Sequence, residues 1–319
     1  HNTSFIMLGN FCFKNASKQK AIELAWTFLI NNLNLNKEKL YITVHKNDNE
    51  TIKIWTNVIK IKNDHIILGD DISNFWSMDE NGPCGYCSEI FYNIEEKKQN
   101  LLEIWNLVFM EFNKQNGKIE KLKNLAIDTG MGLERIASIK QGVFDSFKID
   151  IFTPLINIIL KKFNIKNENH NVRIIADHLK TCILLMKSSL MPSNYGRGYV
   201  LKKLIRKAVI KKNELKVKFK LCILSDDFVN HIYSDDLKAQ VDLNIIKNVL
   251  DLEEEKFDHV VKNGLKLIKD TIKKNKSISG EMIFMLYDTY GIPLDLITDI
   301  TKKYNINLDL KTFYLEMKK

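Results

Sequence analysis

The sequence predicts an α+β protein with two domains, and three observations support this. The chain has 319 residues, which exceeds the usual size of one domain. The first 150 residues mix strand and helix patterns, whereas the later hydrophobic spacing is that of helices. Residues 1–150 carry 18 basic and 19 acidic side chains, and residues 151–319 carry 30 and 20. We therefore expect two domains, at 1–150 and 151–319. The net positive charge of the second domain fits either binding of a polyanion or a lysine-rich surface exposed to solvent.

The first half is expected to contain four strands and two helices. An amphipathic helix is expected at 18–31, where apolar residues recur at helical spacing. The stretch LLEIWNLVFMEF at 101–112 is apolar almost throughout and predicts a buried central strand. Three shorter strands are expected at 4–13, 40–45 and 64–68. Between them, 82–89 is interpreted as a glycine-rich aromatic loop, and 128–139 as a glycine turn that continues into a helix.

The second half is expected to be helical. Helical spacing occurs at 151–163, 172–187, 198–212, 236–275 and 281–287. In the segment 198–212 the apolar residues form one stripe: Val200, Leu201, Leu204, Ile205, Ala208 and Val209. Its basic residues are expected to point away from that stripe: Lys202, Lys203, Arg206, Lys207, Lys211 and Lys212. This face fits either contact with phosphates or an ordinary solvated surface.

Composition excludes a membrane protein and favours a reducing compartment. No run approaches the roughly 18 apolar residues of a membrane span. The five cysteines are odd in number and scattered, and no signal peptide opens the chain, so we expect a cytoplasmic location, in a bacterial cytosol or an organelle matrix. Lys, Ile and Asn are abundant and have A/T-rich codons, which indicates an AT-rich genome. Arginine is confined to Arg135, Arg173, Arg197 and Arg206, where a planar two-pronged donor is needed.

Two segments of the first half carry polar groups that suggest a site. Glu103 and Asn106 lie inside an apolar strand, where polar groups need partners or a ligand. The run Gly130-Met131-Gly132-Leu133-Glu134-Arg135 precedes a helix. Glycines allow close approach of a ligand, and a helix start with an arginine one turn in suits a phosphate. A tight structural connection is the simpler explanation of a lone glycine pair.

Seven segments, in order, resemble the alanyl-tRNA synthetases, a class II family. They are HNTSFIMLGNFCF, NFWSMDENGPCGYCSEIFY, EIWNLVFMEFN, DTGMGLERIA, VRIIADHLKTC, MPSNYGRGYVLKKLIRKAV and LYDTYGIPLDL, from His1 almost to Lys319. The resemblance implies an antiparallel sheet flanked by helices, followed by an all-helical tRNA-recognition domain. It also implies the reaction: alanine is activated by ATP to alanyl-adenylate and transferred to the 3′ end of tRNA(Ala).

The resemblance assigns roles to residues of the first half. For ATP it implies stacking of adenine on Phe5, contacts at Gly132, phosphate binding by Arg135, and help from Glu103 with Mg²⁺–ATP; Arg135 and Glu103 are the expected catalytic residues. For alanine it implies five residues: Trp76, Asn106, Val108, Asp128 and Gly130. Asp128 would pair with the ammonium group, although a helix cap is a second role for it. Trp76 and Val108 would limit side-chain size.

The resemblance also places an acceptor-stem site in the second half. Asn194 and Asp288 match the family residues that read a G·U pair, which an amide and a carboxylate can do from the minor groove. The basic residues expected to bind the tRNA backbone are Arg197, Lys202, Lys203, Arg206 and Lys207.

The cysteine pair Cys84 and Cys87 has zinc-like spacing, but no histidine follows within 93–100 and no second pair exists. Zinc needs about four ligands, so we expect structural thiols and no zinc. His178 is expected to be a packed helix residue. The expected cofactors are ATP and Mg²⁺, and the partners are the tRNA(Ala) acceptor stem, alanine and ATP, with no membrane; a monomer is favoured.

Some features depart from the family. The usual Glu is Ile6, the usual Gly after Met78 is Asp79, and the segment 94–102 is short. Motif 1 and the first half of motif 2 do not occur, and neither does the editing-domain zinc motif. The sequence therefore predicts the catalytic and acceptor-stem part of an alanine–tRNA ligase. The alternative is a non-catalytic RNA-binding relic; a free-standing editing protein is disfavoured because its metal motif is missing.

Overall fold

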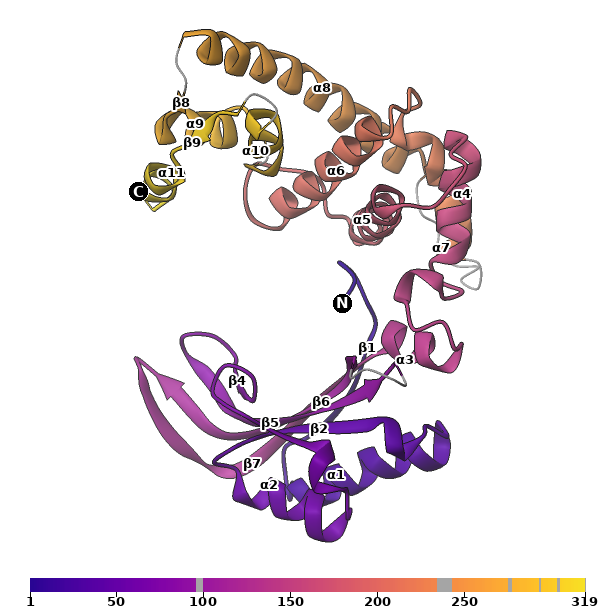
Figure 1. Cartoon of the computed structure of the whole chain (residues 1–319), viewed down its shortest axis with the longest axis vertical. Coiled ribbons are helices and arrows are strands. Elements are labelled where there is room, and N and C mark those ends of the chain that lie inside the picture. The colour runs from indigo at the N-terminus through magenta and orange to yellow at the C-terminus, as the bar shows by residue number, and fades with distance from the viewer. Residues whose placement is uncertain (96–99, 234–242, 275–276, 293, 303–304, 319) are drawn as a thin grey trace. The chain divides into compact units, whose positions relative to one another are not determined.

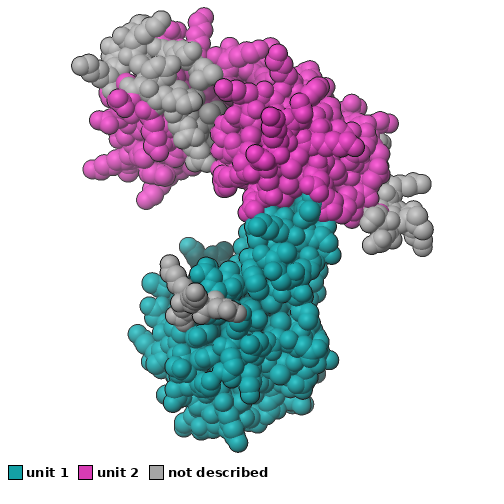
Figure 2. Space-filling model, turned by 45° about the vertical axis from the view of Figure 1, so that its right-hand side comes forward, with its two compact units in different colours: residues 1–153 teal, residues 154–319 magenta. Residues whose placement is uncertain are grey.

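The chain forms two compact units, His1–Thr153 and Pro154–Lys319. The computed structural model describes residues 1–95, 100–233, 243–274, 277–292, 294–302 and 305–318 (Figure 1). Unit 1 holds a large sheet with helices, and unit 2 is helical apart from one pair of two-residue strands. Figure 2 colours the two units separately. The predicted α+β fold class is confirmed.

The sheet of unit 1 has seven strands in the order β1-β7-β6-β5-β2-β3, with β4 beside β5. The strands are β1 (Met7–Cys12), β2 (Leu40–His45), β3 (Ile66–Gly69), β4 (Phe75–Ser77), β5 (Gly82–Asn93), β6 (Leu101–Gln115) and β7 (Lys118–Gly132). Neighbours are antiparallel except β2 and β3, which are parallel. The expected antiparallel sheet is therefore confirmed, with one parallel pair at its edge.

Helices cover one face of this sheet. Figure 1 shows α1 (Lys18–Thr27) and α2 (Asn49–Lys53) on that side. Apolar side chains of these helices and of the π-helical turns that follow them, at Phe28–Asn32 and Ile54–Val58, meet alternate residues of β6 in one core. This core includes Ile22, Leu29, Trp55, Trp105, Leu107 and Phe109. The residues between them on β6 must face the other way, because successive side chains of a strand alternate. The helix core thus fixes which side of the sheet is left for a site.

The helix predicted at 18–31 consists of two kinds of turn. Ser17 caps α1 by accepting a hydrogen bond from the Lys20 backbone N, 3.3 Å away. After Thr27 the chain continues as a π-helical turn at Phe28–Asn32. Asn34 then adopts a positive φ of 51°, which ends the helical path.

Two glycine-rich segments interpreted as a turn and a loop are strands, so both predictions are wrong. Residues 128–132 continue β7, and α3 (Leu133–Lys140) starts directly afterwards, which confirms the helix that was expected after the turn. Residues 82–89 belong to β5. The glycines are explained by close packing between strands: a Cβ on Gly130 would lie 2.6 Å from Met7 Sδ, and one on Gly85 would lie 1.9 Å from the Phe109 carbonyl oxygen. Asp128 consequently sits in a strand and caps no helix.

Unit 2 contains the predicted helices and three others. Its elements are α4 (Thr153–Phe163), α5 (His170–Lys187), α6 (Gly196–Glu214), α7 (Ser225–Ile232), α8 (Leu243–Lys274), β8 (Ser277–Ile278), α9 (Gly280–Asp288), α10 (Leu294–Lys302), β9 (Asn307–Leu308) and α11 (Leu310–Glu316). Residues 236–242 and 275 of the helix expected at 236–275 lie outside the described residues. The parallel β8–β9 pair is an addition to the all-helical expectation.

The faces of α6 differ from the prediction. Leu201, Ile205, Ala208 and Val209 are buried as expected, but the Val200 side chain is 53% exposed. Arg206 and Lys212, which were expected in solvent, are buried. The prediction for these two residues is wrong because α8 packs against α6 and supplies carboxylates that the spacing of α6 alone does not reveal.

Each of the two buried cations has a specific set of partners. Arg206 donates through Nη1 to the Gly291 carbonyl oxygen at 2.8 Å, and its guanidinium carbon lies 5.1 Å from the centre of the Phe257 ring. Lys212 forms an ion pair with Glu254 of α8, and both side chains are buried. The second oxygen of Glu254 accepts a hydrogen bond of 2.8 Å from the Leu221 backbone N. Arg206 and Lys212 therefore stabilise the packing of unit 2.

Candidate functional site

The register of the sheet gathers polar residues on the face without helices. Glu89 pairs with Asn106, and Asn106 pairs with Gly130 on the next strand. Two residues along, Cys87 pairs with Val108, and Val108 with Asp128. Because side chains repeat every second residue on one face, both rows share a face, opposite Trp105, Leu107 and Phe109. The five residues that the resemblance assigns to alanine are Trp76, Asn106, Val108, Asp128 and Gly130, and we call this set the predicted amino-acid pocket.

Trp76 and Val108 belong to one small apolar cluster on this face. Val108 is 6% exposed and packs with Cys87 and Met110, and Trp76 packs against the same cluster. The strand β4 brings Trp76 there, since Trp76 pairs with Gly85 of β5. Two residues that are 32 positions apart in the sequence thus form one apolar wall.

Asp128 lies beside this wall, and its carboxylate group has no hydrogen-bond partner among the described residues. Its side chain is half-buried, and this burial raises the pKa of its carboxyl group. A carboxylate that has lost part of its hydration favours a cationic ligand. The position suits an ammonium group.

A β-bulge brings Glu103 to the same face. Ile90 pairs with Trp105 and Phe91 with Glu103, so Ile104 is an extra residue in β6. Strict alternation from Asn106 would place Glu103 on the helix side, but Ile104 and Trp105 both lie in the helix core. Glu103 Oε2 is 2.9 Å from Arg135 Nη1, which also donates to the Glu103 carbonyl oxygen at 2.7 Å. The structure therefore joins Glu103 and Arg135, the two residues that were expected to be catalytic.

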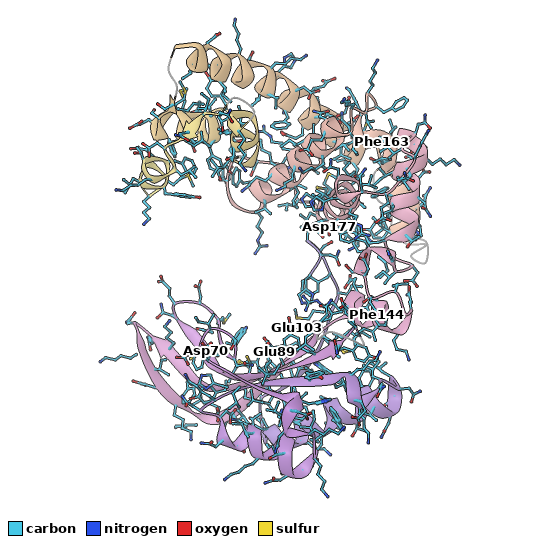
Figure 3. All side chains as sticks on the ribbon, in the orientation of Figure 1. Asp70, Glu89, Glu103, Phe144, Phe163 and Asp177 are labelled. Atoms are coloured by element: carbon cyan, nitrogen blue, oxygen red, sulfur yellow. The ribbon has the colours of Figure 1, made fainter. Side chains whose placement is uncertain are left out.

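Glu89 is a site residue that sequence reasoning missed. Its side chain lies near Glu103 on the face away from α1 and α2 (Figure 3). Burial, followed by repulsion from Glu103, raises the pKa of Glu89 to about 7, and the hydrogen bond from Thr43 and the charge of Arg135 oppose this rise. The available signal was a single acid between the apolar or small neighbours Cys87, Ser88 and Ile90.

Replacing Glu89 by Gln should stabilise unit 1 at alkaline pH. Because the folded pKa of about 7 exceeds the ordinary 4.5, the stability that the carboxyl group contributes is complete below pH 4.5. It is lost as pH rises through 7. We expect Glu89→Gln to raise the free energy of unfolding by about 1–2 kcal/mol at pH 8 and by little at pH 4.5.

The measurement is denaturant unfolding followed by tryptophan fluorescence. All four tryptophans lie in unit 1, so this signal reports that unit alone. Glu120→Gln, which changes an exposed carboxylate of β7, is the matched control and should have little effect at either pH. An equal effect of Glu89→Gln at both pH values would contradict the raised pKa.

Phe5 lies near the end of β7 and stacks on a flat ring. The His1 and Phe5 ring centroids are 4.1 Å apart, with an interplanar angle of 12°. A Cβ on Gly132 would lie 2.7 Å from His1 Cε1, so only glycine leaves this space open. The imidazole shows that a planar ring fits between Phe5 and the backbone of Gly132. These residues are suited to an adenine ring.

Two of the three departures noted in the sequence lie wholly in the described residues. The Ile6 side chain is 53% exposed, and its backbone N donates to the buried carboxylate of Glu134 at 3.1 Å. Asp79 lies at the exposed tip of the β4–β5 hairpin. The short segment 94–102 includes residues 96–99, which lie outside the described residues. A polar contact at Ile6 is therefore made by its backbone.

The cysteine pair does not form part of a recognisable metal site. Both thiols are buried, and burial raises the pKa of Cys84 and takes that of Cys87 to about 12. Zinc binds thiolates, which such burial disfavours. Within the described residues, no three His, Cys, Asp or Glu side chains are grouped to share a metal. His178, on α5, is hydrogen-bonded to Asp177 at 3.1 Å.

The predicted acceptor-stem residues lie on unit 2. Asn194, Arg197, Lys203 and Asp288 are exposed, and Lys202 and Lys207 are partly exposed. Lys202 donates to Asn194 Oδ1 at 2.6 Å. The hydroxyl groups of Tyr199 and Tyr287 are 3.2 Å apart, which joins the helix that follows Asn194 to the helix that ends at Asp288. Arg206 is excluded from this surface because it is buried.

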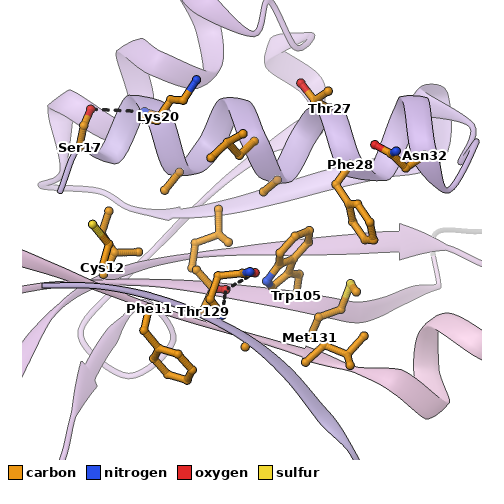
Figure 4. A pocket seen from close by; sticks show the side chains of 18 of the residues that line it. Phe11, Cys12, Ser17, Lys20, Thr27, Phe28, Asn32, Trp105, Thr129 and Met131 are labelled. Carbon is orange, nitrogen blue, oxygen red and sulfur yellow. Dashed lines mark hydrogen bonds between the residues drawn. The ribbon is translucent and has the colours of Figure 1, made fainter. Parts of the chain in front are cut away.

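A separate cavity of about 600 Å³ lies on the helix side of the sheet. Figure 4 shows it between α1 and the strands, with Phe28 and Trp105 at one end. Its lining contains none of the residues expected to bind alanine or ATP. Its lining is chiefly apolar and includes one lysine, Lys20, but no carboxylate that could pair with the ammonium group of alanine.

No helix in the described part of the chain is both long and apolar enough to cross a membrane.

A family model described as "tRNA synthetases class II (A)" matches residues 1–319. Proteins named "Alanine--tRNA ligase" are similar to the chain. That of Buchnera aphidicola subsp. Schizaphis graminum is 42% identical over 337 residues. That of Pseudoalteromonas translucida is 40% identical over 333 residues. Each match covers 98% of this chain and 38% of the relative.

Proposed function

The chain belongs to the class II tRNA synthetase family whose model it matches throughout, and from this we propose that it acts as an alanine–tRNA ligase. In the proposed reaction, alanine and ATP give alanyl-adenylate, and the alanyl group is then transferred to the 3′ end of tRNA(Ala). The chain spans about 38% of the length of the curated relatives it matches. The observation that carries the proposal is the pocket of Trp76, Val108 and Asp128 on the open face of the sheet.

The pocket residues have complementary roles. Asp128 pairs with the ammonium group of alanine and holds it against the sheet. Trp76 and Val108 form a wall close to the methyl group, which excludes larger side chains by overlap. Such a wall rejects glycine and serine less well, because one methyl group provides only about 1–3 kcal/mol of discrimination.

The ATP residues lie at the end of the same sheet face. Phe5 stacks on the adenine ring, for which Gly132 leaves room. Arg135 binds the phosphates, and in the free protein Glu103 holds its guanidinium group in place. Glu103 contributes a carboxylate for the Mg²⁺ that accompanies ATP, and this ion neutralises phosphate charge when bound. A guanidinium group aimed at the α-phosphate would stabilise the charge that develops during attack by the alanine carboxylate.

The experiment that tests this activity is exchange of labelled pyrophosphate into ATP, dependent on alanine. We expect exchange with alanine, weaker exchange with serine and glycine, and none with valine. Binding of tRNA(Ala) without any alanine-dependent exchange would favour the RNA-binding alternative.

The acceptor-stem surface separates backbone binding from base reading. Arg197 and Lys203 are exposed cations suited to phosphates, together with Lys202 and Lys207. Asn194 and Asp288 are exposed polar groups suited to a minor-groove edge. Lys202 also fixes the Asn194 amide, so a change at Lys202 would mix the two roles.

Variants of unit 2 should separate these roles. Arg197→Ala combined with Lys203→Ala should weaken binding of all tRNAs alike and lower the slope of log affinity against log salt by about 1–2. Asn194→Ala should instead reduce the preference for a G·U over a G·C stem by about 1–3 kcal/mol. The measurement is binding and aminoacylation of minihelices that differ only at that base pair. Equal loss on both stems after Asn194→Ala would contradict the reading role.

A further inference from the structure

We propose that Glu89 is a positioning residue that orients the Asn106 side-chain amide so that its carbonyl oxygen faces the amino-acid pocket. That oxygen would accept a hydrogen bond from the ammonium group of the amino acid, beside the Asp128 carboxylate. The inference deepens the proposed function and rests on it, because it assumes that an amino acid occupies this pocket.

Only one end of the Asn106 side-chain amide, its NH₂ group, has a hydrogen-bond partner among the described residues. Its Nδ2 donates to Glu89 Oε1, 3.4 Å away, and the two residues are register partners on β6 and β5. Its Oδ1 is buried and has no hydrogen-bond partner among the described residues. A buried acceptor without a partner costs free energy unless a ligand or a water molecule supplies a donor. The free oxygen is therefore available to a ligand with N–H groups.

The chemistry of Glu89 determines which end of the amide is free. When Glu89 is ionised, its carboxylate accepts hydrogen bonds and cannot donate them, so Asn106 must turn its NH₂ group toward Glu89. The carbonyl oxygen then points away from Glu89. A neutral Gln at position 89 could either donate or accept, which would allow Asn106 to present its NH₂ group instead. An NH₂ group there could not accept a hydrogen bond from an ammonium group.

Glu89 is itself held by a chain of hydrogen bonds. Thr43 donates through Oγ1 to Glu89 Oε2 at 3.3 Å and accepts from Asn74 Nδ2 at 2.8 Å. Asn74 is fully buried and also donates to the Cys87 carbonyl oxygen at 3.1 Å. Because Asn74 directly precedes β4, the same chain of bonds anchors the strand that carries Trp76. Two parts of the pocket thus depend on one network.

The row of register pairs places Asn106 next to Asp128. Asn106 pairs with Gly130, two residues from Asp128 on the same face of β7. Gly130 has no side chain to separate them, and a Cβ there would meet Met7 Sδ at 2.6 Å. One ammonium group could therefore reach both acceptors, the Asn106 oxygen and the Asp128 carboxylate.

The test is calorimetric titration of L-alanine at pH 8, above the Glu89 pKa of about 7, into the 319-residue chain and three variants. Glu89→Gln should weaken alanine binding about tenfold, equivalent to about 1.4 kcal/mol. The double variant Glu89→Gln with Asn106→Asp exchanges the two groups: the new amide donates to the new carboxylate, and an oxygen again faces the pocket. It should restore affinity to within about threefold of wild type. Glu120→Gln is the control and should bind alanine as wild type does.

The outcomes separate positioning from general structural support. Because Glu89→Gln is expected to raise stability at pH 8, weaker binding by a more stable protein is a result that loss of structure cannot produce. Unchanged alanine affinity of Glu89→Gln would overturn the proposal. Weakened binding that the double variant fails to restore would also overturn it, since Glu89 would then act by its charge alone.

If the proposed function is wrong, the titration of the wild-type chain itself fails. If the wild-type chain binds no alanine at any concentration tested, the amino-acid pocket itself is wrong. The orientation of Asn106 is then checked without ligand, through the NMR signals of its side-chain NH₂ group, identified by their loss in Asn106→Asp. Glu89→Gln should shift these signals; unchanged signals would show that Glu89 does not hold the amide.

Discussion

Asp128→Asn is expected to reduce alanine-dependent pyrophosphate exchange by at least about a hundredfold. The substitution keeps the shape of the side chain and removes its charge. A buried ammonium group without its carboxylate partner costs about 3–5 kcal/mol, and each 1.4 kcal/mol is a factor of ten. The structure strengthens this expectation, because Asp128 is half-buried and has no hydrogen-bond partner among the described residues that could take over its role.

The control for this prediction is Asp79→Asn, which removes an exposed carboxylate at the tip of the β4–β5 hairpin. It should leave exchange within about twofold of wild type, as most surface substitutions have small effects. Near-normal exchange by Asp128→Asn at saturating alanine, with an unchanged Michaelis constant, would contradict the assignment of Asp128.

Glu254→Ala is expected to destabilise unit 2 by about 3–5 kcal/mol. The carboxylate of Glu254 pairs with buried Lys212 and accepts a hydrogen bond from the Leu221 backbone N. Its removal leaves a buried cation and a buried N–H group without partners, which costs far more than the loss of an exposed ion pair. The measurement is denaturant unfolding followed by circular dichroism of the helices. Tryptophan fluorescence should show unit 1 unchanged, because no tryptophan lies in unit 2.

The neighbouring residue supplies a matched control. Glu255 lies on the same helix, is 55% exposed and pairs with the partly exposed Lys220 at 2.7 Å. Glu255→Ala should cost less than about 1 kcal/mol. Replacing both members of the buried pair, as in Lys212→Met with Glu254→Leu, should recover much of the stability, since no buried charge remains. Equal effects of Glu254→Ala and Glu255→Ala would show that the buried pair does not hold α6 against α8.

Hydrophobic spacing predicts those helices and strands that carry one strong apolar pattern of their own. The spacing located β6 and the helices α4, α5 and α6, because each has a single strong apolar pattern. It failed at Arg206, whose burial depends on α8, Phe257 and Gly291, all distant in the sequence. It also failed at 128–132, where the Met7 side chain of the neighbouring strand β1 packs close to Gly130. Contacts between distant segments leave no periodic pattern in either segment.

Glu89 was missed for a related reason. Its importance depends on Asn106 and Glu103 on the next strand and Thr43 on the strand beyond. A single acid in an otherwise apolar segment is a visible anomaly, but only the register of three strands identifies its partners. Glu103 and Asn106 were recognised because both lie in one short stretch of β6. Their common face, however, could not be predicted from the sequence alone.

The bulge at Ile104 determines which residues of β6 face the site. On each side of Ile104, side chains alternate between the two faces of the sheet, but the alternation is shifted by one residue across the bulge. If β6 kept the same residues but paired without the bulge, Glu103 would turn toward the helices and Leu102 would take its place on the open face. Deleting Ile104 would instead leave Glu103 facing the site, because Glu103 would then alternate directly with Trp105. The bulge therefore lets two consecutive apolar residues, Ile104 and Trp105, fill the helix core while the preceding acid still faces the site.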